Sequence, residues 1–203
     1  MKIAIIGGTG NVGQRIAVEA QTRGHQVTVI ARKGSAAIPF GATFLPGDVV
    51  ADATGLGEKL KGFDVLVSSA HFASVDAVHV LQAARSAGIQ RLFVVGGAGS
   101  LEVAPGVRVV DTPDFPAAWK PEALGGAQFL DSLRKTDDID WTFLSPGALF
   151  VPGLRTGKFR LGGDTLMADA NGNSVISYED YAIAALDEIE TPAHLRQRFS
   201  VAY

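Results

Sequence analysis

The stretch Gly7-Gly8-Thr9-Gly10-Asn11-Val12-Gly13 decides the fold. A short apolar run, residues 2–6, precedes it, and the segment that follows to residue 23 places four apolar side chains on one helical face: Val12, Ile16, Ala17 and Ala20. The three glycines at positions 7, 10 and 13 therefore lie between a predicted strand and a predicted helix. In such a unit the chain turns sharply and backbone N–H groups approach a pyrophosphate.

This turn predicts a dinucleotide site. The helix N-terminus supplies partial positive charge and unpaired N–H donors for the pyrophosphate, and Thr9 and Asn11 offer side-chain hydrogen bonds to phosphate oxygens. Tight turns also use glycine for purely structural reasons, but the strand and helix on either side favour binding. The residues expected to contact the cofactor here are Gly7, Thr9, Gly10, Asn11, Val12 and Gly13.

The end of the second predicted strand, residues 26–31, indicates which dinucleotide binds. Proteins that prefer NAD tend to have an acidic residue there, which holds the ribose 2′-OH. This chain instead has Arg32 and Lys33. A guanidinium pairs with a phosphate and stacks on adenine, so we expect NADP(H) to be preferred over NAD(H). The alternative is that both are solvated surface cations.

Two further strand ends contribute candidate residues. After the third strand, Asp48 and Val49 are expected near the adenine, although Asp48 would serve equally well as a cap for the helix that begins near Asp52. After the fourth strand, the small residues Ser69 and Ala70 leave room for a ribose. His71 follows them as a conceivable acid or base, although a lone loop histidine is more often structural.

The apolar runs along the chain predict an α/β fold. Strands are expected at residues 2–6, 26–31, 43–45, 64–68, 91–95, 141–144 and 199–202. Helical patterns lie between several of them, including one with Val78, Leu81 and Ala84 and one over residues 122–135 that includes Leu124. Strands without alternation, separated by helices, are typical of a parallel sheet covered on both faces. The fold class is a Rossmann-type doubly wound sheet.

One domain, residues 1–203, is expected from the length and from the lack of a low-complexity linker. The character changes after Pro146: residues 153–163 are rich in Gly and basic residues, residues 169–173 form a turn cluster, and residues 178–190 are predicted to be helical. From about residue 146 onward, we expect a small C-terminal cap over the substrate side of the sheet's carboxyl edge.

Composition excludes several classes of protein. The 18 Lys and Arg against 21 Asp and Glu leave no basic excess for nucleic acid, and the absence of Cys excludes disulfides and thiolate metal sites. No metal site is expected. No apolar run reaches the roughly 18 residues of a membrane span, and no signal peptide is recognised. We therefore expect a soluble, cytoplasmic protein, whose oligomeric state the sequence leaves open.

The chain resembles the atypical short-chain dehydrogenase/reductases of the NAD(P)H-binding, or NmrA-like, group, and is most similar to small bacterial proteins described as NADH-flavin reductases. The motifs that carry the resemblance lie at residues 7–13, 95–101, 111–116, 140–147, 155–164 and 176–182. The resemblance implies a Rossmann domain, a bound dinucleotide and, more loosely, hydride transfer. It also implies that Pro146 and Gly147 pack against the nicotinamide.

One departure from the resemblance affects the chemistry. Conventional members use a serine after the fifth strand together with Tyr-x-x-x-Lys on the next helix. Ser100 matches the serine and is the candidate catalytic residue, but the chain contains no Tyr-x-x-x-Lys. Lys120 and Leu124 fall about where the tyrosine and lysine would be expected. The usual machinery for reducing a carbonyl group is therefore missing.

Two aromatic residues are candidates for the substrate side. Trp119 ends a proline-rich loop, residues 105–119, and loops of that length are usually lids or binding loops. Its ring would stack on a flat substrate, or would merely fasten the loop. Phe150 is equally consistent with a substrate-lining side chain and with a core aromatic.

These observations favour an NADPH-dependent reductase of a flat conjugated acceptor, a flavin or quinone. Such an acceptor spreads the incoming charge over its rings, so proximity and stacking carry most of the catalysis. The second hypothesis is a non-enzymatic redox sensor that binds NADP(H) and acts through a protein partner. An isomerase or epimerase is disfavoured because those enzymes typically retain the catalytic tyrosine.

Overall fold

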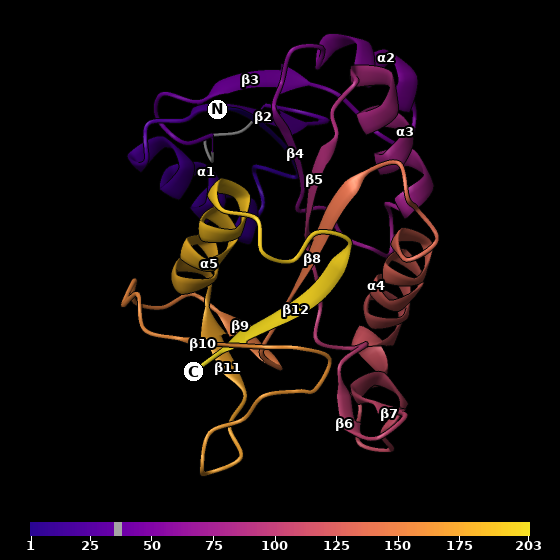
Figure 1. Ribbon diagram of the computed structural model, residues 1–203, viewed down its shortest axis with the longest axis vertical. Coiled ribbons are helices and arrows are strands. Elements are labelled where there is room, and N and C mark those ends of the chain that lie inside the picture. Colours follow the sequence, from indigo (N-terminus) through magenta and orange to yellow (C-terminus); the bar gives the residue numbers. More distant parts are fainter. Residues whose placement is uncertain (35–37) are drawn as a thin grey trace.

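The computed structural model describes residues 1–34 and 38–203 and is built around one eight-stranded sheet (Figure 1). The strand order is β10-β12-β8-β5-β4-β1-β2-β3. The strands are β1 (Lys2–Ile6), β2 (Gln26–Ala31), β3 (Thr43–Pro46), β4 (Val65–Ser68), β5 (Arg91–Val95), β8 (Asp140–Pro146), β10 (Arg160–Gly162) and β12 (Gln197–Ala202). All pair in parallel except β10, which is antiparallel to β12. Strand order reverses direction between β1 and β4, and sheets of this type bind ligands at the carboxyl ends beside that point.

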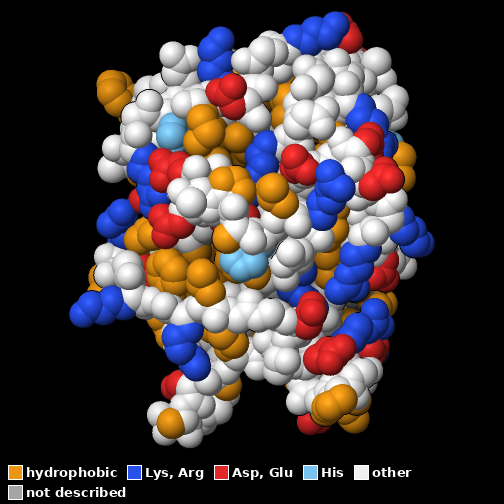
Figure 2. Space-filling model, viewed as in Figure 1, with side chains coloured by type: hydrophobic (Ala, Val, Ile, Leu, Met, Phe, Trp, Pro, Cys, Tyr) orange, Lys and Arg blue, Asp and Glu red, His pale blue; other side chains and the backbone are white. Residues whose placement is uncertain are grey.

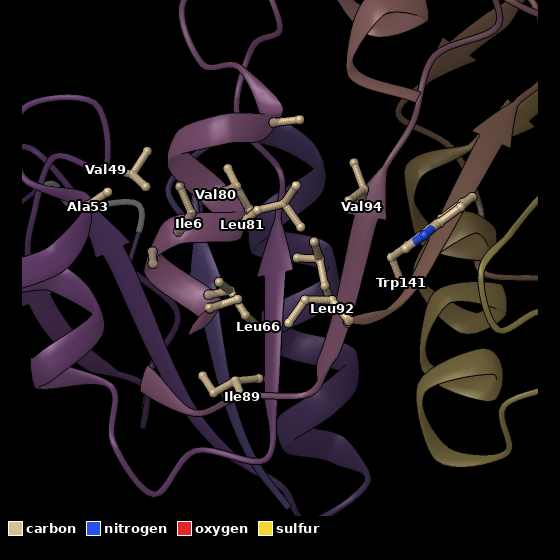
Figure 3. Close-up of a cluster of buried hydrophobic side chains, with 14 of the residues drawn as sticks. Ile6, Val49, Ala53, Leu66, Val80, Leu81, Ile89, Leu92, Val94 and Trp141 are labelled. Atoms are coloured by element: carbon tan, nitrogen blue, oxygen red, sulfur yellow. The ribbon is translucent and has the colours of Figure 1, made fainter. Parts of the chain in front are cut away.

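Helices cover both faces of the sheet. On one face lie α1 (Asn11–Thr22) and α5 (Tyr178–Glu190), and on the other lie α2 (Ala53–Lys59), α3 (Ala77–Ala87) and α4 (Lys120–Leu133) (Figure 1). Each face has its own apolar core. In the core shown in Figure 3, Leu66 and Val94 of the sheet lie against Val80 and Leu81 of α3. The central strands are buried on both faces, which is why their sequences are continuous apolar runs.

Small elements gather at the carboxyl end of the sheet, in the lower part of Figure 1. They are the hairpin of β6 (Glu102–Ala104) and β7 (Val107–Arg108), the parallel pair of β9 (Leu149–Val151) and β11 (Val175–Ser177), and the short 3-10 turns Val109–Asp111 and Ala117–Trp119. In Figure 2 this end divides into two projecting lobes, which correspond to the β6–β7 hairpin and the loop between β10 and β11.

The predicted fold class is confirmed, with one correction at the C-terminus. β12 extends the central sheet beside β8, β10 forms its edge, and α5 covers one face together with α1. These three elements are therefore part of the main body. Only β9, β11 and their connections act as a cap at the carboxyl edge. The sequence did not predict this arrangement because the residues of a short strand do not indicate which other strand it pairs with.

Two apolar residues of the predicted helical patterns face solvent, and one predicted loop contains regular structure. Val78 is 63% exposed and Leu124 37% exposed, because Ala77, Val80 and Leu81 of α3 and the far side of α4 face the core instead. Residues 105–119 were expected to be a loop but contain β7 and both 3-10 turns.

On the face shown in Figure 2, Lys and Arg side chains alternate with Asp and Glu rather than forming a basic surface. Within the described residues, no helix is both long enough and apolar enough to cross a bilayer.

Candidate functional site

The N-terminus of α1 presents unused backbone donors. Gly10 is the N-cap and gives no side-chain cap, and its own N–H donates to the Gly7 carbonyl at 2.9 Å. Within residues 1–34 and 38–203, the N–H groups of Asn11, Val12 and Gly13 have no backbone or side-chain acceptor. Three converging donors at the positive end of a helix form a site suited to an anion such as a pyrophosphate.

The three spaced glycines differ in how much room the structure leaves for a side chain. Gly7 has φ +74°, and a Cβ there would lie 2.4 Å from the Ser69 carbonyl oxygen. A Cβ on Gly13 would lie 2.4 Å from the Gly7 carbonyl oxygen, so α1 packs directly on the turn. At Gly10 the nearest atom would be 3.2 Å away. Gly7 and Gly13 thus serve the fold, whereas a Cβ on Gly10 would meet a single atom within 4 Å, the Gly7 carbonyl oxygen, in a tight but less severe contact.

The other predicted residues of this turn lie around the same donors. Thr9 is half-buried, and its carbonyl accepts a hydrogen bond from Gln14 Nε2 at 2.7 Å. Asn11 is exposed, and Val12 packs partly against the α1–α5 core. All three stay predictions for cofactor contact.

Arg32 and Lys33 follow β2 at the carboxyl edge, next to the turn, because β2 pairs with β1. Both side chains are exposed, and neither is paired with a carboxylate in the described part of the chain. Exposed guanidinium and ammonium groups at this strand end are suited to pairing with a phosphate group.

Asp48 and Val49 lie after β3. Asp48 Oδ1 accepts from the N–H groups of Val50 and Ala51, at 3.0 and 3.3 Å, whereas Asp52 caps α2 by accepting from Gly55 N–H at 2.8 Å. Asp48 thus caps a turn rather than the helix itself. Val49 is 3% exposed and packs in the core, so only its backbone is available to a cofactor.

Ser69 and Ala70 lie directly beside the glycine-rich turn. Ser69 N–H donates to the Ile6 carbonyl at 2.9 Å, and the Ser69 carbonyl approaches Gly7 closely enough to exclude any side chain there. The segment after β4 therefore connects the turn to a pocket that begins at His71.

A pocket of about 780 Å³ opens at the carboxyl ends of β5 and β8. Its lining is mostly apolar and comes from the segments that follow β4, β5 and β8 and from the first turns of α4. Five of the predicted site residues line it: Ser100, Trp119, Pro146, Gly147 and Phe150. An apolar cavity with a few polar groups is the usual form of a small-molecule site, and this volume suits a ligand of several rings.

The two aromatic candidates hold different positions in this pocket. Trp119 is 58% exposed at the junction of the second 3-10 turn and α4, so its ring has a free surface at the pocket rim. Phe150 is half-buried, with its ring 4.8 Å from that of Tyr178 and 4.7 Å from that of Tyr181. Phe150 is therefore both a core aromatic and a pocket wall.

Gly147 has a local reason to be glycine, since a Cβ would lie 2.9 Å from the Val175 backbone nitrogen. The connection from β8 to β9 therefore packs against the start of β11, and Pro146 is buried beside it. Contact with a nicotinamide stays a prediction for both residues.

Two residues that line the pocket, Glu122 and Phe72, were not predicted from the sequence. Glu122 of α4 accepts from the N–H groups of Phe72 and Ala73, both at 2.9 Å, and so fixes the loop after β4. The ring of Phe72 packs against those of Phe129 and Phe143, with centroid distances of 5.2 and 5.9 Å. Glu122 also lies 3.6 Å from His71 Nδ1, and His71 is 89% exposed at the pocket. The hydrogen bond between Phe72 and Glu122 could not be predicted because the two residues are 50 positions apart in the sequence.

None of the three tyrosines lines the pocket. Tyr181 is fully buried and donates to the Leu144 carbonyl at 2.7 Å, and burial raises its pKa well above the usual value. Tyr178 packs on Phe150, and Tyr203 donates to Asp180. Lys120 and Leu124 do not line the pocket either; this helix presents Glu122, Ala123 and Gly126 instead.

Two of the resembling motifs meet in space. Asp180 of α5 is fully buried and accepts from Thr156 N–H, Thr156 Oγ1 and Gly157 N–H, at 2.7, 2.5 and 2.8 Å. Burial alone would raise the pKa of this carboxyl, but these donors and the Tyr203 hydroxyl lower it below its usual value. The motif at 176–182 thus anchors the basic loop at 155–164.

Comparison with known proteins agrees with this geometry. A family model described as NAD(P)H-binding matches residues 7–192. The chain is 44% identical over 211 residues to the uncharacterized protein YwnB of Bacillus subtilis (strain 168), a match that covers 99% of this chain and 98% of that protein.

Two solved structures are each 36% identical to the chain and cover all of it. One is named a "putative epimerase" and comes from Bacteroides thetaiotaomicron, with a TM-score of 0.92 and 96% of its chain covered. The other is named a "putative NADH-flavin reductase" and comes from Streptococcus pneumoniae TIGR4, with a TM-score of 0.85 and 99% of its chain covered.

Proposed function

The chain belongs to the NAD(P)H-binding family, and we propose that it is an NADPH-dependent reductase of a flat conjugated acceptor, a flavin or a quinone. One observation carries the proposal. An apolar pocket with an exposed Trp119 at its rim adjoins a dinucleotide-type turn, and among residues 1–34 and 38–203 no tyrosine or lysine lines that pocket. The name of the 36% identical reductase-like structure supports the same class of reaction.

The residues divide the work as follows. The α1 N-terminus and the turn at residues 7–13 hold the pyrophosphate, and the segment after β4 continues toward the pocket. The bound dinucleotide would supply a hydride. Trp119 and Phe150 orient a flat ring by stacking, and the apolar walls exclude water. Water supplies the proton afterwards, so no side chain with a matched pKa is required.

The preference for NADPH rests on Arg32 and Lys33. Both are exposed at the end of β2, where the ribose of the adenosine half would lie, and no acidic residue occupies that strand end. A charge-assisted hydrogen bond from Arg32 contributes about 1.5–3 kcal/mol. We expect NADPH to bind at least about tenfold more tightly than NADH.

Two other functions stay open to the same test. A redox sensor that acts through a protein partner would bind NADP(H) without turnover, and the missing Tyr-x-x-x-Lys agrees with it equally well. An epimerase, the activity in the name of the other 36% identical structure, would need an acid or base at the pocket. A cytoplasmic location and a single domain over residues 1–203 stay predictions.

The test is NADPH oxidation with a panel of flavins, quinones and simple ketones. We expect turnover with flavins or quinones, little with ketones, and a rate that varies weakly between about pH 6 and 8. Trp119→Ala should raise the KM for the acceptor more than it lowers kcat, with the exposed Leu154, outside the pocket, replaced by Ala as the matched control. Rapid reduction of a plain ketone would contradict the proposal.

A further inference from the structure

A buried guanidinium lies behind the pocket. Arg198 is on β12, and its side chain is 3% exposed. Its Nη1 donates to the Ser100 hydroxyl oxygen at 3.5 Å, and its Nε donates to Asp164 Oδ1 at 2.5 Å. Nη2 pairs with the same carboxylate. Ser100 is thus the only one of these three side chains that lines the pocket within the described residues.

The chemistry of the guanidinium fixes the direction of this hydrogen bond. Arginine has five N–H donors and no acceptor, so the Ser100 oxygen must accept. A serine hydroxyl also carries one donor, and in residues 1–34 and 38–203 that donor has no acceptor. The hydroxyl proton is therefore available to a molecule in the pocket.

Arg198 and Asp164 are buried to different extents, so their opposite charges do not cancel at Ser100. The charge of Arg198 is almost withdrawn from water, whereas Asp164 is 62% exposed and is better screened by solvent. The field at Ser100 therefore has a net positive character. A hydroxyl that accepts from a cation is a stronger donor through its own proton, because hydrogen bonds in a chain polarise one another.

We propose that Arg198 is a positioning residue that turns and polarises Ser100, so that the Ser100 hydroxyl donates to an oxygen of the acceptor where negative charge accumulates. This inference rests on the proposed reductase function. In that reaction a C–H bond of NADPH breaks, the hydride bonds to the acceptor, NADPH is oxidised, the acceptor is reduced, and water supplies one proton. The acceptor class is narrowed to conjugated rings that carry a carbonyl oxygen, a description that fits flavins and quinones.

A purely structural role for Arg198 makes a different prediction. The Asp164 pair alone would join β12 to the loop after β10, and its loss would weaken the fold regardless of what stands at position 100. A role exercised through Ser100 requires that the two side chains act as one unit. A double-mutant cycle separates these cases.

The experiment compares the wild type with Ser100→Ala, Arg198→Met and the double variant. Each is measured for kcat with menadione and FMN, for binding of oxidised FMN by fluorescence titration, and for NADPH affinity. We expect each single change to lower kcat about tenfold, as for one charge-assisted hydrogen bond, with NADPH affinity unchanged. The double variant should be no slower than Ser100→Ala. Arg198→Lys, which keeps the charge, should recover part of the loss.

The outcomes separate this inference from the proposed function. If Arg198→Met lowers kcat as much in the Ser100→Ala background as in the wild type, the positioning role is wrong although the reductase function stands. If the wild type binds FMN without turnover and the cycle in FMN affinity is still non-additive, the positioning role stands and the reductase function fails. Additive effects on FMN affinity, or no FMN binding and no turnover, overturn the inference. If Arg198→Met does not fold, the same cycle with Arg198→Lys decides.

Discussion

At the scale of single residues, glycines 7, 10 and 13 look equivalent in the sequence but differ in the structure. A Cβ on Gly7 or Gly13 would lie 2.4 Å from a carbonyl oxygen, whereas one on Gly10 would be 3.2 Å from its nearest neighbour. Real Cβ atoms do not approach carbonyl oxygens at 2.4 Å, so substitution at positions 7 and 13 must distort the turn. Position 10 therefore offers a way to separate binding from folding.

We expect Gly10→Val to abolish dinucleotide binding and leave the fold intact, because its side chain would fill the space in front of the first N–H groups of α1. Calorimetric titration with NADPH and a thermal melt would measure the two effects. Gly13→Ala is the matched variant and should lower the melting temperature instead. Wild-type NADPH affinity in folded Gly10→Val would place the cofactor elsewhere.

Cofactor choice is also decided by one side chain. Arg32→Ala should remove most of a preference for NADPH that we expect to be about tenfold or more, and should change NADH affinity little, because only the 2′-phosphate meets the guanidinium. Titrations with both nucleotides would measure this. As a control, Arg134→Ala removes an exposed arginine at the far end of α4. Equal wild-type affinities for the two nucleotides would refute the assignment.

At the scale of elements, the sequence pattern predicted those helices and strands that depend on contacts between residues close together in the chain. β1, the glycine-rich turn, α1 and β2 follow one another along the chain, and α5 was predicted at residues 178–190, where it occurs. The pairing of β12 with β8 and the β6–β7 hairpin depend on distant or very short segments, which carry no periodic signal. Ser100 was identified from the family resemblance, whereas the contacts of Glu122 and Arg198 join segments 50 and 98 residues apart and are visible only in three dimensions.

The tie between α1 and the loop after β9 should make stability depend on pH. Glu19 of α1 is 5% exposed and accepts from Arg155 Nε and Nη2, both at 2.9 Å, and from Arg23 Nε at 2.9 Å. The hydrogen bonds from Arg155 lower the pKa of Glu19 below its usual 4.5, against the opposing effect of burial. Because the pKa of Glu19 is lowered in the folded state, its ion pairs stabilise the fold fully at pH values above the usual pKa. This contribution is lost as the pH falls through the lowered pKa.

We therefore expect Glu19→Gln to lower the free energy of unfolding by about 1–2 kcal/mol at neutral pH and to make its decline in acid less steep than in the wild type. Urea denaturation from about pH 7 to about pH 3 would measure both effects. Glu58→Gln breaks an exposed ion pair with Lys61 and should leave the slope unchanged. An acid slope in Glu19→Gln equal to that of the wild type would contradict this account.

At the scale of the whole molecule, the sheet brings two half-sites together at one edge. The adenosine half is expected at the carboxyl ends of β1, β2 and β3, with its exposed cations, and the reacting half at the apolar pocket beyond β4, β5 and β8. The reversal of strand order between β1 and β4 lies between the halves. A dinucleotide that spans this edge would extend its nicotinamide toward Ser100 and Trp119, and the remaining volume would hold the acceptor.

The most direct test is an anaerobic stopped-flow experiment in which enzyme saturated with NADPH is mixed with FMN or menadione. The account predicts that NADPH absorbance falls and the acceptor is reduced with the same single rate constant. This rate constant should drop with NADPH deuterated at the transferred hydrogen, and should change little between about pH 6 and 8. Tight NADPH binding with no oxidation by any flavin or quinone would contradict it and would favour the sensor.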